Sequence, residues 1–87
     1  MVFHITYRLT PKHRDDAQQR FKKTGGLPPA GVTMTQRWHS AEGLVGFIIA
    51  ESSDAEAIGR WTQEWTDVLS FEITPVLNDE QITRVIG

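Results

Sequence analysis

Residues 32–52 read VTMTQRWHSAEGLVGFIIAES, and this stretch decides the fold of the chain. Apolar and polar side chains alternate over residues 32–39, and a second, more apolar run follows over residues 44–52. Both runs have the length and pattern of β-strands. The short segment from Ser40 to Gly43 between them is polar and ends in glycine, as hairpin turns often do. The stretch therefore predicts an antiparallel hairpin.

A strand and a helix are predicted before this hairpin. Residues 2–8, VFHITYR, alternate with a period of two, which is typical of a half-buried strand. Thr10 followed by Pro11 marks the start of a helix, because threonine caps a first turn and proline fits the first helical position. Gly25 and Gly26 end that helix, and a proline-rich loop then leads into the hairpin.

A second helix and a fourth strand are predicted after the hairpin. Ser53 and Glu56 have the spacing of a capping box, which opens a helix. The apolar stripe of this helix is formed by Ile58, Trp61, Trp65 and Val68 or Leu69. Residues 71–77, FEITPVL, read as a strand. Its Pro75 cannot donate to a hydrogen-bond ladder, so we expect this strand at a sheet edge.

The order of elements is βαββαβ, followed by a short C-terminal helix that residues 78–81 cap and that bears Ile82, Val85 and Ile86. Two right-handed crossovers then give one four-stranded antiparallel sheet with both longer helices on one face. The strand order is 4-1-3-2, which places the proline-containing strand at an edge. The sequence therefore predicts a single α+β domain over residues 1–87 with the ferredoxin-like arrangement.

Strict alternation along each strand divides the side chains between the two faces of the sheet. The helix-covered face is predicted to hold Phe3, Ile5, Tyr7, Met34, Trp38, Val45, Phe47, Ile49, Phe71 and Ile73. The open face is predicted to hold His4, Thr6, Arg8, Thr35, Arg37, His39, Leu44, Gly46, Ile48, Ala50, Glu72, Thr74 and Val76. This second set is too apolar to be simply solvated, so we expect the open face to be an interface or a ligand surface.

Self-association is the first interpretation of that face. A chain of 87 residues buries a smaller share of its surface than a larger domain, and pairing two copies adds burial. We therefore expect a homodimer through the open sheet face, which would form an α+β barrel with a semi-polar interior. The alternative is that the open face binds a small molecule.

Five residues of the open face form the candidate ligand site. With the turn at residues 40–43, His39 would lie opposite Leu44, and Arg37 would lie opposite Gly46. Glycine within a strand is costly and leaves room for a ligand or for the arginine itself. Arg37 and His39, together with His4, Gly46 and Glu72, could then hold a small anion and move a proton. Trp38 would be a core residue, and the alternative for His39 is a strand-end residue in a dimer interface.

Several function classes are excluded or disfavoured. The chain has no cysteine, which removes disulfides, thiolate metal sites and thiol catalysis. Only three histidines are present, with no spacing typical of a metal site, and no cofactor is predicted. The net charge of −2 favours neither nucleic acid nor a membrane surface as a partner. No apolar run is long enough to span a membrane, and the first residues do not form a secretory signal, so we expect a cytoplasmic protein.

Binding of RNA needs a separate test, because the RNA-recognition module has the same βαββαβ order. That module carries a basic residue and then exposed aromatic residues on its third strand. Here Glu42 takes the basic position, and Leu44 and Gly46 take the stacking positions. The sequence therefore does not support RNA binding in that manner.

Three motifs resemble those of a family of small bacterial proteins classed as a domain of unknown function: a TGG-PP-GV loop, an RWH strand end and a FE-TPV-D-E tail. The resemblance extends over nearly the whole chain. It implies a ferredoxin-like domain of the dimeric α+β-barrel type and brings no established activity or catalytic residue.

The function predicted from these observations is a small-ligand-binding or regulatory module without identified catalysis. The alternative is a small dimeric α+β-barrel enzyme, of the cofactor-independent monooxygenase or isomerase type, that uses an open-face cavity. In that case His39 and Arg37, and with them His4, would handle protons or an oxyanion.

Overall fold

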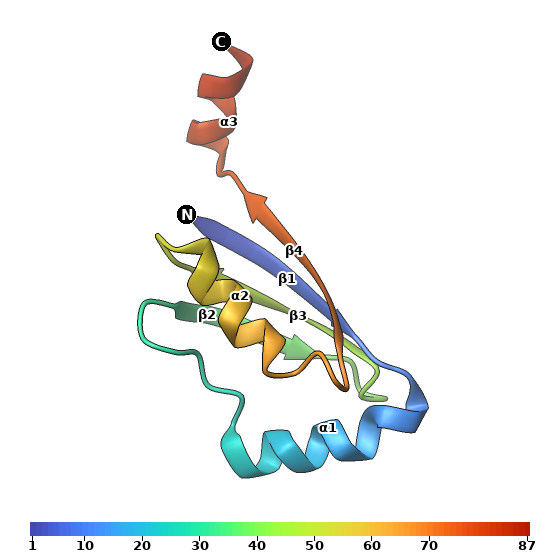
Figure 1. Ribbon diagram of the computed structural model, residues 1–87. Helices are drawn as coiled ribbons and strands as arrows, with labels where there is room; N and C mark the ends of the chain where they lie inside the picture. Colours follow the sequence, from blue (N-terminus) through green and yellow to red (C-terminus); the bar gives the residue numbers. More distant parts are fainter.

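The fold is described from a computed structural model that covers residues 1–87. The elements, in chain order, are β1 (Val2–Arg8), α1 (Pro11–Thr24), β2 (Thr33–His39), β3 (Val45–Glu51), α2 (Ala55–Gln63), β4 (Ser70–Val76) and α3 (Asp79–Ile86). The four strands form one antiparallel sheet in the order β2-β3-β1-β4 (Figure 1). The predicted ferredoxin-like fold, its strand order and its short C-terminal helix are confirmed.

The edge position of β4 agrees with its proline. Pro75 lies opposite Phe3 of β1, and β4 has no neighbour on its other side. An edge strand tolerates the missing N–H of proline, whereas a central strand would lose a ladder hydrogen bond. The position of the proline therefore predicted the position of the strand correctly.

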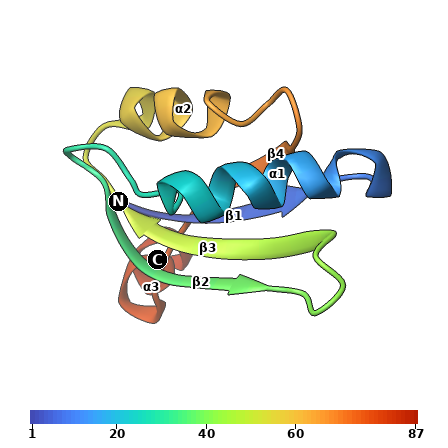
Figure 2. The same ribbon diagram turned by 90° about the horizontal axis from the view of Figure 1, so that it is seen from below.

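The core lies between one face of the sheet and the helices. Its main cluster is formed by Phe3, Ile5, Val32, Ile48, Ala50, Ala57, Ile58 and Trp61. A smaller cluster joins Ala17 of α1 to Trp65 and Val68, which follow α2. In Figure 2 both α1 and α2 lie together, away from α3. The amphipathic stripe predicted for the second helix is thus buried, although its last residues belong to the turn after α2 rather than to the helix.

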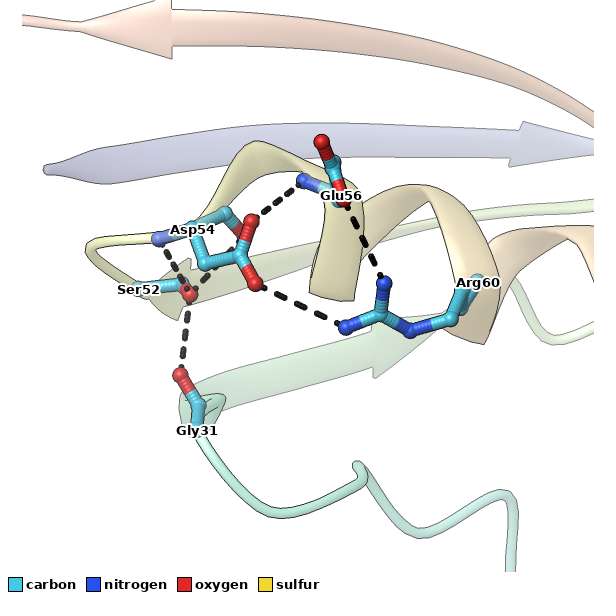
Figure 3. Close-up of polar contacts among 5 residues, drawn as sticks. All are labelled: Gly31, Ser52, Asp54, Glu56 and Arg60. Atoms are coloured by element: carbon cyan, nitrogen blue, oxygen red, sulfur yellow. Dashed lines mark hydrogen bonds and ion pairs between the residues drawn. The ribbon is translucent and has the colours of Figure 1, made fainter.

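The start of α2 differs from the prediction by one residue. The N-cap is Asp54, whose side chain accepts a hydrogen bond from the Glu56 backbone N–H at 2.9 Å, so Ser53 does not form the predicted capping box. Ser52 is buried, and its hydroxyl accepts from the Asp54 N–H and lies 2.9 Å from the Gly31 carbonyl oxygen (Figure 3). The hydroxyl of Ser52 thereby joins the start of α2 to the loop before β2.

The predicted assignment of β3 to the two faces was wrong. Gly46, Ile48 and Ala50 point toward the helices, while Val45, Phe47 and Ile49 lie on the open face. Alternation cannot orient this strand, because nearly all of its residues are apolar. Packing against β1 decides the orientation. The small residues Gly46 and Ala50 lie opposite the large Tyr7 and Phe3, so that large and small side chains fill one layer.

The second half of β2 was also assigned to the wrong face. A register shift between Met34 and Gln36 leaves Thr35 as an extra residue. A bulge of this kind reverses the alternation beyond it. Arg37 and His39 therefore face the helices, and Trp38 lies on the open face with 61% of its surface exposed. The predicted core role of Trp38 was wrong. The predicted cross-strand pairs were also wrong, because His39 lies opposite Gly46, and Arg37 lies opposite Ile48.

The helix ends follow their sequence signals. Thr10 stands at the N-cap of α1 with Pro11 in the first turn, and Gly25 closes the helix in the left-handed conformation at φ 76°. Asn78 and Gln81 form a reciprocal capping box at the start of α3. This last helix extends beyond the end of the sheet (Figure 1) and buries none of its residues. No helix is long and apolar enough to cross a membrane.

Candidate functional site

A cavity of about 240 Å³ lies between α1, the end of α2 and the helix-covered face of the sheet. Most of its wall is apolar and includes Leu9, Phe21, Trp61, Trp65, Leu69 and Phe71. Tyr7, Arg37 and His39 add polar groups to this wall. A concave apolar site with a few converging polar groups is the usual form of a small-molecule site.

Two arginines hold α1 over the cavity. Arg20 of α1 makes a two-pronged ion pair with Asp67, at 2.8 and 2.6 Å, in the turn after α2. From the other side, the Arg37 guanidinium of β2 donates to the Gly25 and Gly26 carbonyl oxygens, both at 2.8 Å. Ala17 is the one buried residue of α1. The helix is therefore braced over the sheet rather than packed tightly onto it.

The closest polar contact in the cavity joins Tyr7 to His39. The Tyr7 hydroxyl lies 2.6 Å from Nδ1 of His39. The His39 ring also meets the Phe21 ring edge-on, with 5.3 Å between ring centroids. Tyr7 is buried, whereas His39 is exposed at the rim with Nδ1 turned inward. The pair thus connects the buried wall of the cavity to its opening.

Burial sets the protonation states of this pair. It is the main cause that raises the pKa of Tyr7, with Arg37 opposing and exposed Glu42 adding to the rise. Burial, and then the charge of Arg37, lowers the pKa of His39 below its ordinary value. Both side chains are therefore neutral at neutral pH. Nδ1 is the one hydrogen-bond partner of the Tyr7 hydroxyl, so we infer that the phenol donates to it and that the neutral imidazole carries its hydrogen on Nε2.

Arg37 has no acidic partner. Its two terminal nitrogens bind backbone carbonyls, its guanidinium lies 4.8 Å from the centroid of the Phe21 ring, and no carboxylate forms an ion pair with it. Burial lowers the pKa of Arg37. An arginine nevertheless keeps its proton at neutral pH. The cavity wall therefore carries a partly desolvated positive charge without a counter-ion.

Gly46 makes room for the Tyr7 ring. A Cβ at this position would lie 2.5 Å from the Trp38 carbonyl oxygen and even closer to the Tyr7 ring. The ring can cross the β3 backbone only because residue 46 has no side chain. Gly46 thus acts on the site through Tyr7, and the space that the sequence suggested for a ligand or for Arg37 is filled by this ring.

The structure divides the predicted site residues between the two faces. Arg37, His39 and Gly46 come together on the helix-covered face, not on the open face where they were expected. His4 and Glu72 do lie on the open face, where the His4 ring stacks on Phe47 at 5.5 Å between centroids. The two groups are therefore on opposite sides of the sheet and cannot form one site. No cluster of three histidine, aspartate or glutamate side chains is arranged to hold a metal ion.

Sequence reasoning missed Tyr7 and Phe21 as site residues. Tyr7 was assigned to the correct face but only as a core residue. Its hydroxyl was the available signal, because a buried phenol needs a hydrogen-bond partner. Phe21 lies in the first helix, and nothing in the sequence indicates that it contacts both Arg37 and His39.

Fold and cavity define the class of protein: a ferredoxin-like α+β domain with an apolar cavity under its first helix. The chain belongs to the family DUF3303, described as a domain of unknown function, whose model matches residues 1–87. No curated protein matches the chain.

A similar solved structure is provisionally described as an antibiotic biosynthesis monooxygenase from Deinococcus radiodurans. It is 10% identical, and the alignment covers 90% of this chain and 94% of that one with a TM-score of 0.47.

Substitution of Gly46 tests the packing that orients the site. We expect Gly46→Ala to lower the free energy of unfolding by about 1–3 kcal/mol, the usual range for overpacking a core. Gly59→Ala is the matched control, because a Cβ there meets nothing within 4 Å. It is expected to stabilise α2 by about 0.5–1 kcal/mol, as alanine does in helices. Urea denaturation measures both, and equal stability of the two variants would contradict the packing argument.

Proposed function

We propose that this domain binds a small, mostly apolar molecule in the cavity under α1 and serves as a ligand-binding or regulatory module, a cytoplasmic homodimer. The observation that carries the proposal is the cavity of about 240 Å³, whose apolar wall bears the Tyr7–His39 pair and Arg37. Its volume is below the range of about 300–1,000 Å³ typical of drug-sized ligands. A ligand the size of one aromatic ring with a short chain suits this space.

The position of the cavity supports binding rather than simple loose packing. Trp61 and Trp65 line one side, and Phe21 lines the other. Flat aromatic walls favour an apolar or aromatic guest, whose burial gains about 25 cal/mol per Å² of apolar surface. The polar groups would orient one end of this guest.

The tryptophans provide the binding test. Trp38→Phe removes the exposed tryptophan, so that the remaining emission comes from Trp61 and Trp65 in the cavity wall. We expect 3-phenyl-1-propanol to change this emission saturably. Ala17→Leu fills the cavity from α1 and should weaken binding at least about tenfold, the effect of roughly 1.4 kcal/mol. Ala55→Leu makes the same change on the exposed side of α2 and should bind normally. Equal binding by the two leucine variants would refute the proposed cavity site.

A second candidate function is an enzyme of the dimeric α+β-barrel kind, of the cofactor-independent monooxygenase or isomerase type. The hydrogen bond between Tyr7 and His39 favours it. A neutral histidine at the cavity rim can accept a proton through Nδ1 when the hydroxyl turns away, and its other nitrogen reaches the opening. The sheet face differs from the original expectation, but the same His39 and Arg37 would act.

Replacing His39 distinguishes the two candidates. His39→Ala removes the proton acceptor and leaves the apolar walls in place. The enzyme hypothesis expects turnover of a bound substrate to fall about 100-fold or more, which is typical for loss of an acid–base residue. The measurement is product formation by mass spectrometry after incubation with small carbonyl and phenolic compounds. Unchanged turnover in a folded His39→Ala protein would exclude His39 as the catalytic base.

The open sheet face supports the homodimer. Trp38 of β2 and Phe47 of β3 form a cross-strand pair there, and His4 of β1 stacks on Phe47. Ile49 continues this aromatic and aliphatic row. Leu77 and the apolar side of α3 are exposed as well. Covering such surfaces with a second copy is the burial that a domain of this size lacks on its own.

A charge placed in this row should prevent dimerisation. Trp38→Glu puts a carboxylate into this row on the edge strand β2, and we expect a monomer by sedimentation velocity at concentrations where the natural chain is dimeric. Gln19→Glu makes the same change of charge on exposed α1 and should stay dimeric. A natural chain that sediments as a monomer at every concentration would rule the open-face dimer out.

A further inference from the structure

Arg37 determines the chemical class of ligand that the cavity can take. The only other titratable side chains in the wall are Tyr7 and His39, and no aspartate or glutamate is among the lining residues. Glu42 in the hairpin turn acts on Tyr7 at a distance, but it forms no ion pair with Arg37. The fixed charge of the cavity is therefore that of one guanidinium.

Such a cation is costly without a counter-ion. Carbonyl dipoles at the end of α1 and the face of Phe21 compensate the charge in part. A full negative charge compensates it far better, because the interaction takes place at a partly desolvated site. A guanidinium also retains donors beyond the two that bind Gly25 and Gly26, and these suit carboxylate oxygens.

The second polar group of the cavity, His39, also favours an anion over a cation. With Nδ1 accepting from Tyr7, the imidazole of His39 offers an N–H at Nε2 and no free acceptor. Arg37 and His39 flank the same Phe21 ring, so that the two side chains lie at one end of the cavity. Arg37 and His39 thus present donors and no free acceptor, which favours an anion over an ammonium group at this end of the cavity.

We propose that the ligand is a small apolar monoanion, a carboxylate attached to a ring or a short chain, whose charge pairs with Arg37 while its apolar part lies against Trp61 and Trp65. This inference rests on the proposed binding function and assigns the ligand class of that same cavity. The carboxylate lies at the end near Arg37 and His39. The apolar part enters between α1 and the sheet.

Three compounds with one skeleton test this assignment. They are 3-phenylpropionate, 3-phenyl-1-propanol and 3-phenylpropylamine, titrated into the Trp38→Phe protein at pH 7.5 with tryptophan emission as the readout. We expect the carboxylate to bind at least about tenfold tighter than the alcohol, as a charge-assisted hydrogen bond does. The amine should bind most weakly.

Variants of the two bracing arginines provide the matched control. Arg37→Gln should bring the carboxylate to the affinity of the alcohol, while Arg37→Lys keeps the charge and should keep a preference for the carboxylate. Arg20→Gln removes an arginine that also braces α1 and whose guanidinium lies over the Trp65 ring, so the starting emission is expected to change. Arg20 does not line the cavity, so the preference for the carboxylate should stay unchanged. Circular dichroism confirms that each variant is folded. If Arg37→Gln is unfolded, the relative affinities of the carboxylate and the alcohol in the natural chain and in Arg37→Lys still test the assignment.

The outcomes separate the two proposals. Equal affinity for carboxylate and alcohol in the natural chain would keep the cavity as a binding site and overturn the monoanion assignment. A preference that survives in folded Arg37→Gln would also overturn it. Absence of binding by all three compounds would count against both proposals. Both proposals are supported if the natural chain binds the carboxylate tightly and if, among the arginine variants, Arg37→Gln alone loses this tight binding.

Discussion

The contact between the Tyr7 ring and the backbone of Gly46 is the constraint on which the rest of this structure depends. It places Gly46 beside Tyr7 on the helix-covered side of the sheet and therefore turns Ile48 and Ala50 toward the helices. The same contact puts the Tyr7 hydroxyl within hydrogen-bond distance of His39. One pair of a large and a small residue thus sets both the orientation of β3 and the polar end of the cavity.

The bulge in β2 is the second feature on which the two faces of the sheet depend. Because Thr35 is an extra residue, Arg37 faces α1 and reaches the carbonyls at its C-terminal end. A strictly alternating strand would have sent this arginine to the open face and Trp38 to the core. The bulge therefore supplies the cavity with its charge and gives the open face its largest aromatic residue, so that one irregularity shapes both surfaces of the sheet.

These two features give the domain two different faces. The helix side holds a small apolar cavity with donors at one end, which suits a ligand with a single negative charge. The open side holds an aromatic row, which suits a second copy of the chain. Arg37 serves the first face in two ways, since it braces α1 and presents the charge. Ligand binding and the position of α1 are therefore expected to be coupled.

The sequence by itself determined the element order, the sheet topology and the ends of the first helix. Local signals carry that information: Thr10-Pro11, Gly25, the alternation of residues 2–8 and the edge proline at 75 each act through their own backbone or their immediate neighbours. It also identified Arg37, His39 and Gly46 as candidate site residues, because alternation places Arg37 and His39 on one face of their strand and glycine is costly within a strand.

Only the tertiary structure decided which face those residues occupy. Alternation divides the residues of a strand between two faces, but it does not show which face is buried when both faces are apolar, as in β3. A bulge cannot be recognised from one strand alone, because the register with the partner strand defines it. Packing between β1 and β3 decides the orientation of β3, because the large Tyr7 and Phe3 fit beside the small Gly46 and Ala50. Alternation placed His4 and Glu72 correctly on the open face. They are nevertheless separated from Arg37, His39 and Gly46, because those three residues lie on the other face of the sheet.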